Sequence, residues 1–153
     1  MPVVENEITR GKLFVEKEGE THVFNEIPFV PVRAFTITKV PRKYVRGKHA
    51  HPTCHQFLMC VQGWLQIRVK RPGQKSKLLK LILGEAVYVP PMTWIELLQF
   101  SEFGTLTVLA SEPYDPENTI TSLKEFNGSI RRSTSADAGT SDGSNSGDDE
   151  GAG

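Results

Sequence analysis

Two histidines stand one residue apart, at positions 49 and 51, in a segment otherwise typical of a strand. Side chains alternate across a strand, so His49 and His51 are expected to share one face while Ala50 points the other way. Imidazole is a common metal ligand and also the side chain that titrates nearest to neutral pH. The pair therefore predicts either part of a metal centre or an acid–base site.

Short alternating or apolar segments on both sides of the pair predict the elements that must position it. Strands are expected at 12–16, 34–38, 56–61, 64–69, 78–83, 86–89, 94–100 and 105–110. Glycines and prolines mark the turns between them, and only residues 122–126 suggest a helical turn. Many short strands with almost no helix predict an all-β sandwich or barrel.

The length of 153 residues fits one domain with an appendage. We expect a flexible lead-in over 1–10, an all-β domain over 11–130, and a disordered, acidic, Ser/Gly-rich tail over 131–153. From residue 133 onward there are five acidic residues and no Lys or Arg, so residues 1–132 carry a formal charge of +5. That charge suits a small anionic ligand and is too weak and scattered to indicate nucleic acid.

Several features predict a cytoplasmic protein without membrane contact. No run of about 18 apolar residues could cross a bilayer. Residues 1–10 are polar and acidic, without the apolar stretch of a signal peptide. Cys54 and Cys60 have no spacing typical of a disulfide framework or zinc knuckle, and two small buried thiols are expected in a reducing compartment.

Two motifs carry a resemblance to a known family. The pattern His49-x-His51-x4-Gln56-x6-Gly63 resembles the first cupin motif, in which Glu is usual at the position of Gln56. Gly84-x5-Pro90 resembles the start of the second cupin motif. The resemblance implies a single-domain, RmlC-like jelly roll in which side chains from both motifs converge inside the barrel.

The resemblance narrows to the WxcM-like sugar-nucleotide 3,4-ketoisomerases, which act on dTDP-4-keto-6-deoxyglucose. It covers residues 9–126 in order and rests on Arg10-Gly11-x-Leu13, Arg46-Gly47, Pro90-x3-Trp94 and the stretch 109–115. It implies an isomerase that binds a dTDP-linked sugar, needs no cofactor and forms a homodimer through its N-terminal strands.

The same motifs weigh against the metal alternative. A metal-binding cupin usually adds a Glu and a third His to the first two, and this chain has Gln56 and Ile95 at those positions. Two imidazoles and an amide make a weak site for Zn²⁺ or Fe²⁺. We therefore predict no metal, with His49 as the main proton shuttle and His51 as a second acid–base or oxygen-polarising group; the two roles could be exchanged.

Arg33 and Arg46 are the candidates for binding the diphosphate, because a guanidinium group fits phosphate oxygens with two hydrogen bonds. Surface salt bridges are the alternative for both arginines. Gln56 is expected to hydrogen-bond a sugar hydroxyl or to orient a histidine. Trp94 is expected to fill the core or an interface, and His55, by its spacing, to lie outside the barrel.

The chain departs from the family at Phe35, where Tyr is common, and in the stretch 114–121. The family pattern Tyr-Asp-x-x-x-Tyr-Ile-Arg has Thr119 in place of its second Tyr and Thr121 in place of its Arg. These changes leave a second interpretation open, a non-catalytic cupin that binds a nucleotide sugar or a partner protein. A metal-dependent dioxygenase or epimerase-like enzyme is the third.

Overall fold

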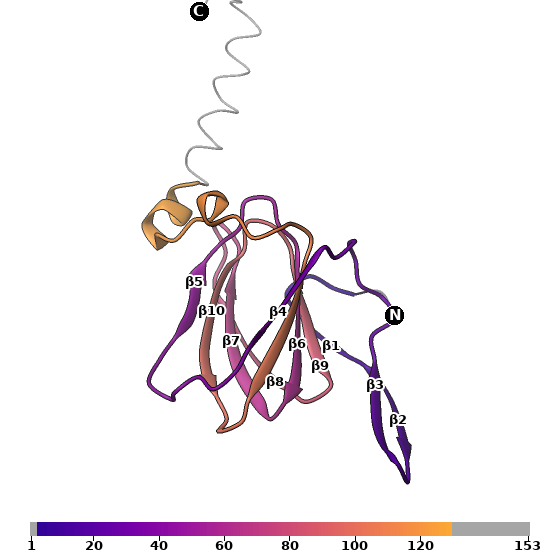
Figure 1. Cartoon of the computed structure of the whole chain (residues 1–153). Helices are drawn as coiled ribbons and strands as arrows, with labels where there is room; N and C mark the ends of the chain where they lie inside the picture. Colours follow the sequence, from indigo (N-terminus) through magenta and orange to yellow (C-terminus); the bar gives the residue numbers. More distant parts are fainter. Residues whose placement is uncertain (1–2, 130–153) are drawn as a thin grey trace, which may run out of the picture.

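The structure is a computed structural model that describes residues 3–129, so the predicted disordered tail lies outside the described residues. Two antiparallel sheets face each other and enclose the core (Figure 1). The first, in the order β1-β9-β6-β11-β4, contains Ile8–Arg10, Glu85–Val89, Gln56–Gln62, Thr105–Ala110 and Arg33–Ile37. The second, in the order β5-β10-β7-β8, contains Arg46–His49, Trp94–Phe100, Trp64–Lys70 and Lys77–Ile82. The predicted all-β jelly roll is confirmed.

Strand β7 shows why the sequence folds in this way. Leu65, Ile67 and Val69 are buried and alternate with half-exposed residues, as a strand with one face on a core requires. They pack with Leu58 of β6 and Val108 of β11 from the opposite sheet. Burial of each such side chain contributes about 1.5–3 kcal/mol, so the alternation fixes which face of each sheet points inward.

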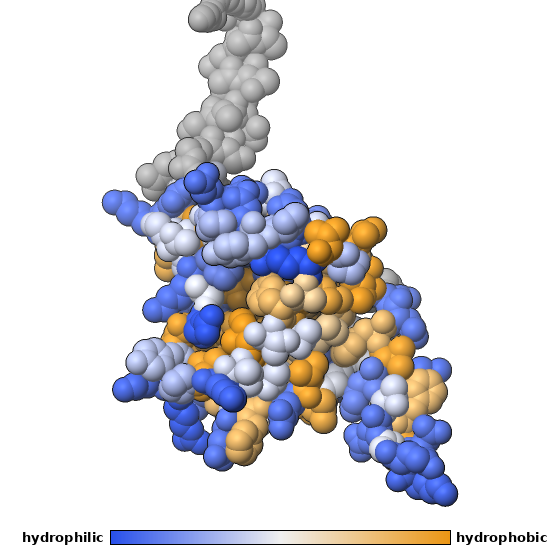
Figure 2. Space-filling model, viewed as in Figure 1, coloured by the Kyte–Doolittle hydropathy of each residue, from blue (hydrophilic) through white to orange (hydrophobic). Residues whose placement is uncertain are grey.

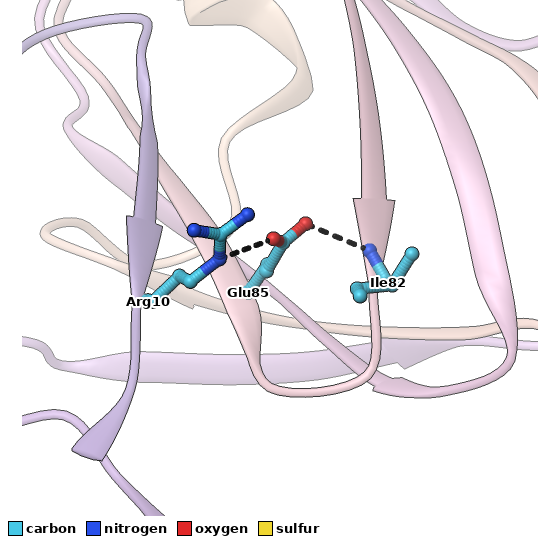
Figure 3. Close-up of polar contacts among 3 residues, drawn as sticks. All are labelled: Arg10, Ile82 and Glu85. Carbon is cyan, nitrogen blue, oxygen red and sulfur yellow. Dashed lines mark hydrogen bonds and ion pairs between the residues drawn. The ribbon is translucent and has the colours of Figure 1, made fainter. Parts of the chain in front are cut away.

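Strand β1 lies inside the segment predicted to be a flexible lead-in. Ile8–Arg10 pairs with β9, and the Arg10 Nε donates to Glu85 Oε2 at 2.9 Å (Figure 3). The other carboxylate oxygen of Glu85, which is buried, accepts from the backbone N–H of Ile82 at 3.1 Å. The structure thus differs from the expectation at the end of the lead-in, because partners far along the chain order a segment too short to show a periodicity of its own.

A hairpin formed by β2 (Lys12–Glu16) and β3 (Gly19–Val23) extends away from the barrel (Figure 1). The strand predicted at 12–16 is confirmed, and β3 is its partner. Leu13, Phe14 and Val15 are exposed along β2. In Figure 2 the hairpin therefore shows hydrophobic residues beside charged ones.

The chain after β11 crosses one end of the barrel. It forms a short 3-10 helix, η1 (Pro116–Asn118), then a single bridge between Ile120 and Ala50, and then a helix over 123–129 that overlaps the helical turn predicted at 122–126. Phe126 of this helix is buried against Trp94, with ring centroids 5.8 Å apart. Figure 2 shows a mainly hydrophilic surface at this end of the barrel. No helix among residues 3–129 is long and apolar enough to cross a membrane.

Candidate active site

A cavity of about 520 Å³ opens at the end of the barrel that the 111–121 segment crosses. All five residues that the sequence singles out contribute to its wall: Arg33, Arg46, His49, His51 and Gln56. They come from β4, β5, the segment after β5, and β6. The structure therefore brings together every predicted site residue in one cavity.

His49 and His51 share the cavity although β5 ends at His49. Ala50 continues the extended backbone by one residue, because it exchanges two hydrogen bonds with Ile120, of 2.9 and 2.8 Å. Its side chain is fully buried on the other face, against Trp94 and Phe126. The alternation expected of a strand is therefore kept, and the imidazole rings lie 4.7 Å apart between centroids.

The environment keeps both imidazoles neutral at pH 7. The pKa of His51 is lowered to about 4, mainly by burial and in addition by the neighbouring His49 and Arg33. Burial also lowers the pKa of His49, opposed by a hydrogen bond to the Gly47 backbone and assisted by the charge of Arg33. A neutral imidazole has a free lone pair, so each ring can accept a proton from a ligand.

Two guanidinium groups lie in the same wall. The Nε of Arg33 donates to the backbone oxygen of Glu112 at 3.1 Å, and its guanidinium lies 5.0 Å from the Phe35 ring centroid and 5.8 Å from that of Tyr114. Within residues 3–129 neither Arg33 nor Arg46 forms an ion pair with a carboxylate. Both positive charges are thus available to an anionic ligand in the cavity.

The inner part of the cavity is apolar. Its side chains belong to the core between the two sheets: Phe35, Ile37, Leu58, Ile95, Leu97, Leu106 and Val108. Ile95 occupies the position where a metal-binding cupin would supply its third histidine, and it is buried. In the described part of the chain, no three His, Cys, Asp or Glu side chains are placed to hold a metal ion.

The segment 112–121 supplies cavity residues that sequence reasoning does not assign to the site: Glu112, Tyr114, Asp115, Asn118, Thr119 and Thr121. Thr119 Oγ1 lies 3.4 Å from Nδ1 of His51. The sequence does contain a signal, since Thr119 and Thr121 stand where the resembling family has an aromatic residue and an arginine. That difference alone does not reveal which cavity group they contact.

Two other predictions concern residues outside the cavity, and the one for His55 is confirmed. His55 lies outside the cavity, where its Nδ1 is 2.7 Å from the hydroxyl oxygen of Tyr88 and its ring stacks on Tyr88. Trp94 is buried as a packing residue, but in a separate apolar cluster with Ala50 and Phe126 and not in the core between the two sheets. Its indole N–H donates to Glu96 at 3.0 Å. The cavity thus offers two neutral imidazoles beside two unpaired cations, which suits removal of a proton next to a carbonyl in an anionic ligand.

Comparisons with known proteins agree on one family. Residues 1–131 match the family described as FdtA: WxcM-like, C-terminal. A TDP-4-oxo-6-deoxy-α-D-glucose-3,4-oxoisomerase from Aneurinibacillus thermoaerophilus is 27% identical over 126 residues, which cover 80% of this chain and 91% of that protein.

Solved structures give the same result. A sugar 3,4-ketoisomerase from Thermoanaerobacterium thermosaccharolyticum, in complex with TDP, is 32% identical with a TM-score of 0.76, over 82% of this chain and 94% of that one. A histidine-to-asparagine mutant of that enzyme, in complex with TDP-4-keto-6-deoxyglucose, is 31% identical with the same TM-score and coverage.

Proposed function

Because this chain belongs to the FdtA family of WxcM-like proteins, we propose that it converts TDP-4-keto-6-deoxyglucose to the corresponding 3-keto sugar. The observation that carries the proposal is the convergence of His49, His51, Arg33 and Arg46 on one cavity. A keto-sugar isomerase needs a proton acceptor beside the reacting carbons and cations for the diphosphate, and the cavity wall contains both.

The proposed reaction moves hydrogen between neighbouring carbons. The ketone at C4 acidifies the proton on C3, and a neutral imidazole removes it, leaving an enediolate across C3 and C4. The C4 oxygen then gains a proton and the C3 hydroxyl loses one. The enolate oxygen is now on C3 and the alcohol on C4. Protonation of C4 then leaves the ketone at C3. One carbon is oxidised as its neighbour is reduced, so the electrons balance without a redox cofactor.

We assign the main proton transfer to His49 and a second acid–base role to His51. The 4.7 Å between their ring centroids supports this assignment, because a proton need travel only a short distance between the two carbons. Gln56, buried in the cavity wall, is proposed to hydrogen-bond a sugar hydroxyl or to orient a histidine. Arg33 and Arg46 are proposed to bind the diphosphate oxygens.

Deuterium exchange tests the proposal. With TDP-4-keto-6-deoxyglucose in D₂O, NMR should show deuterium at C3 and a new 3-keto product. Loss of a general base slows such steps by about 10²–10⁴-fold, so exchange should fall by that factor in His49→Asn. The matched control is His55→Asn, whose side chain lies outside the cavity and which should keep exchange. No exchange with any 4-keto-6-deoxy sugar nucleotide would exclude the isomerase.

A non-catalytic, ligand-binding protein is the second candidate. It is favoured by Thr119 and Thr121, which stand in the cavity wall in place of the aromatic residue and arginine of the resembling family. This candidate predicts that TDP raises the melting temperature while the sugar nucleotide is neither isomerised nor deuterated. Turnover by the wild-type protein would exclude it.

We further propose that the protein works as a homodimer in the cytoplasm. The exposed Leu13, Phe14 and Val15 of the protruding hairpin support a dimer, because a second copy could cover them. Light scattering that gives the mass of one chain at working concentration would contradict it. The free thiols of Cys54 and Cys60 support the proposed cytoplasmic location, because they suit a reducing compartment. Fractionation of the producing cells would check this location.

A further inference from the structure

The bridge between Ala50 and Ile120 sets a contact between two side chains that are 68 residues apart. In an antiparallel pair, the residue after one partner faces the residue before the other. His51 follows Ala50 and Thr119 precedes Ile120, so their side chains are brought to the same side. The 3.4 Å between Thr119 Oγ1 and His51 Nδ1 is the result.

The direction of this contact follows from the other bond that the hydroxyl makes. Thr119 Oγ1 donates to the backbone oxygen of Asp115 at 3.1 Å. A hydroxyl has one proton to donate, so toward His51 it offers a lone pair. Both contacts of the hydroxyl are hydrogen bonds only when the nitrogen facing it carries the hydrogen, which favours the Nδ1–H form of neutral His51.

The acceptor that orients the hydroxyl is itself held in place. The backbone oxygen of Asp115 also accepts from the N–H of Asn118 at 3.2 Å. The Asp115 side chain caps η1 by accepting from the N–H of Glu117 at 3.2 Å. The hydroxyl therefore points its proton at a fixed carbonyl and its lone pair at the imidazole.

We propose that Thr119 is a positioning residue that holds His51 in the Nδ1–H tautomer and so leaves Nε2 as the proton acceptor for the bound sugar. The catalytic role of this tautomer rests on the proposed isomerase function. The tautomer itself can be tested whether or not the protein is an isomerase. It also narrows the role of His51, because an unprotonated Nε2 accepts a proton from the substrate and cannot donate one to a substrate oxygen. A bond that fixes the second nitrogen of a histidine commonly decides which nitrogen does chemistry.

Thr119 departs from the pattern of the resembling family. The resembling family has an aromatic residue at this position of the 114–121 stretch. The bond from Thr119 to Asp115 keeps the hydroxyl within the short segment, and the bridge at Ile120 fixes the distance to His51. Thr119 lacks the aromatic ring of the resembling family, but its hydroxyl supplies a polar contact to His51 of the proposed catalytic pair.

The tautomer can be measured directly in the full chain. Long-range ¹H–¹⁵N NMR at pH 7.5 should show an unprotonated Nε2 and a protonated Nδ1 for His51. Thr119→Val keeps the shape and removes the hydroxyl, so the two tautomers should become mixed, while Thr119→Ser should restore the wild-type signals. Thr121→Val makes the same change two residues away and should leave the tautomer of His51 unaltered.

Kinetics provide the second measurement. If the wild-type protein isomerises TDP-4-keto-6-deoxyglucose, Thr119→Val should lower kcat by about 10-fold, or about 1.4 kcal/mol, with KM unchanged, and Thr119→Ser should recover most of it. Absence of wild-type turnover would count against the proposed function alone, since the NMR result still decides the tautomer. A proton on Nε2 of wild-type His51, or an unchanged tautomer in Thr119→Val, would overturn the inference.

Discussion

The imidazole rings of His49 and His51 lie edge to face, with an interplanar angle of 67° and centroids 4.7 Å apart. At this separation a proton on one ring disfavours a proton on the other, and His49 is accordingly among the causes that lower the pKa of His51. The two rings therefore titrate as a coupled pair. An incoming proton can be held by either ring, which suits transfer between neighbouring carbons of one substrate.

The acid limb of the activity profile should lie well below the usual histidine range. Burial and nearby charge lower the pKa of both rings, that of His51 to about 4, so the proton acceptors stay unprotonated in weak acid. We expect kcat/KM for TDP-4-keto-6-deoxyglucose to stay level through pH 6.5, the usual pKa of histidine, and to fall only at lower pH. Initial rates between pH 4.5 and 8 would check this.

The Arg33→Leu variant refines the same measurement. The charge of Arg33 contributes to the lowered pKa of both histidines, so its removal should move the acid limb toward neutral pH. A wild-type limb centred at or above pH 6.5 would contradict the assignment of two buried, neutral bases.

Folding stability should depend on His51 in the same pH range. The pKa of a histidine is about 6.5 in an unfolded chain and that of folded His51 is about 4, so between these values the unfolded state binds more protons. Stability should therefore fall as pH drops from 6.5 toward 4. In His51→Gln, thermal unfolding between pH 7.5 and 4.5 should show a smaller loss of melting temperature than in wild type. An equal loss in both proteins would show that His51 is not buried in this way.

Removal of either cavity arginine should weaken ligand binding more than turnover. A hydrogen bond to a charged group contributes about 1.5–3 kcal/mol, so Arg33→Leu and Arg46→Met should each weaken TDP binding by about 10- to 100-fold. Isothermal titration calorimetry with TDP measures the effect. Arg42→Met removes a charge outside the cavity wall and is the matched control. Equal binding by Arg46→Met and Arg42→Met would place the diphosphate elsewhere.

The carboxylate of Glu85 should contribute more to stability than its ion-pair partner. Glu85 is buried and accepts from the backbone N–H of Ile82 as well as from Arg10. Glu85→Ala leaves that N–H without its acceptor and should cost about 1–3 kcal/mol. Arg10→Ala should cost at most about 1 kcal/mol, because the Arg10 side chain is 80% exposed. Urea unfolding of both variants tests the order, and a larger loss in Arg10→Ala would reverse it.

The parts of the fold that the sequence predicts are those with a local periodicity. Leu65, Ile67 and Val69 alternate with polar residues, so the strand and its inward face can be inferred from β7 alone. Ile8–Arg10 shows no comparable pattern. Its order depends on β9 and on the buried Glu85, which lies 75 residues away along the chain.

The candidate site also has a part that can be predicted from the sequence and a part that cannot. A spacing of two residues places His49 and His51 on one face, and the resemblance to a known family adds Arg33, Arg46 and Gln56 to the same cavity. The contact of Thr119 with His51 could not be predicted, since it depends on a bridge between segments 70 residues apart. A threonine in an irregular stretch has no pattern that indicates such a partner.

The reciprocal bridge between Ala50 and Ile120 is made by main-chain atoms alone. Substitutions at the flanking positions 119 and 121 therefore keep the two main-chain bonds of this bridge while they alter side chains in the cavity wall. Because the main chain holds the bridge and the side chains line the cavity, side chains in the 115–121 stretch can change with little loss of folding stability. A library randomised at Thr119 and Thr121 should accordingly contain many folded members that differ in rate or substrate preference.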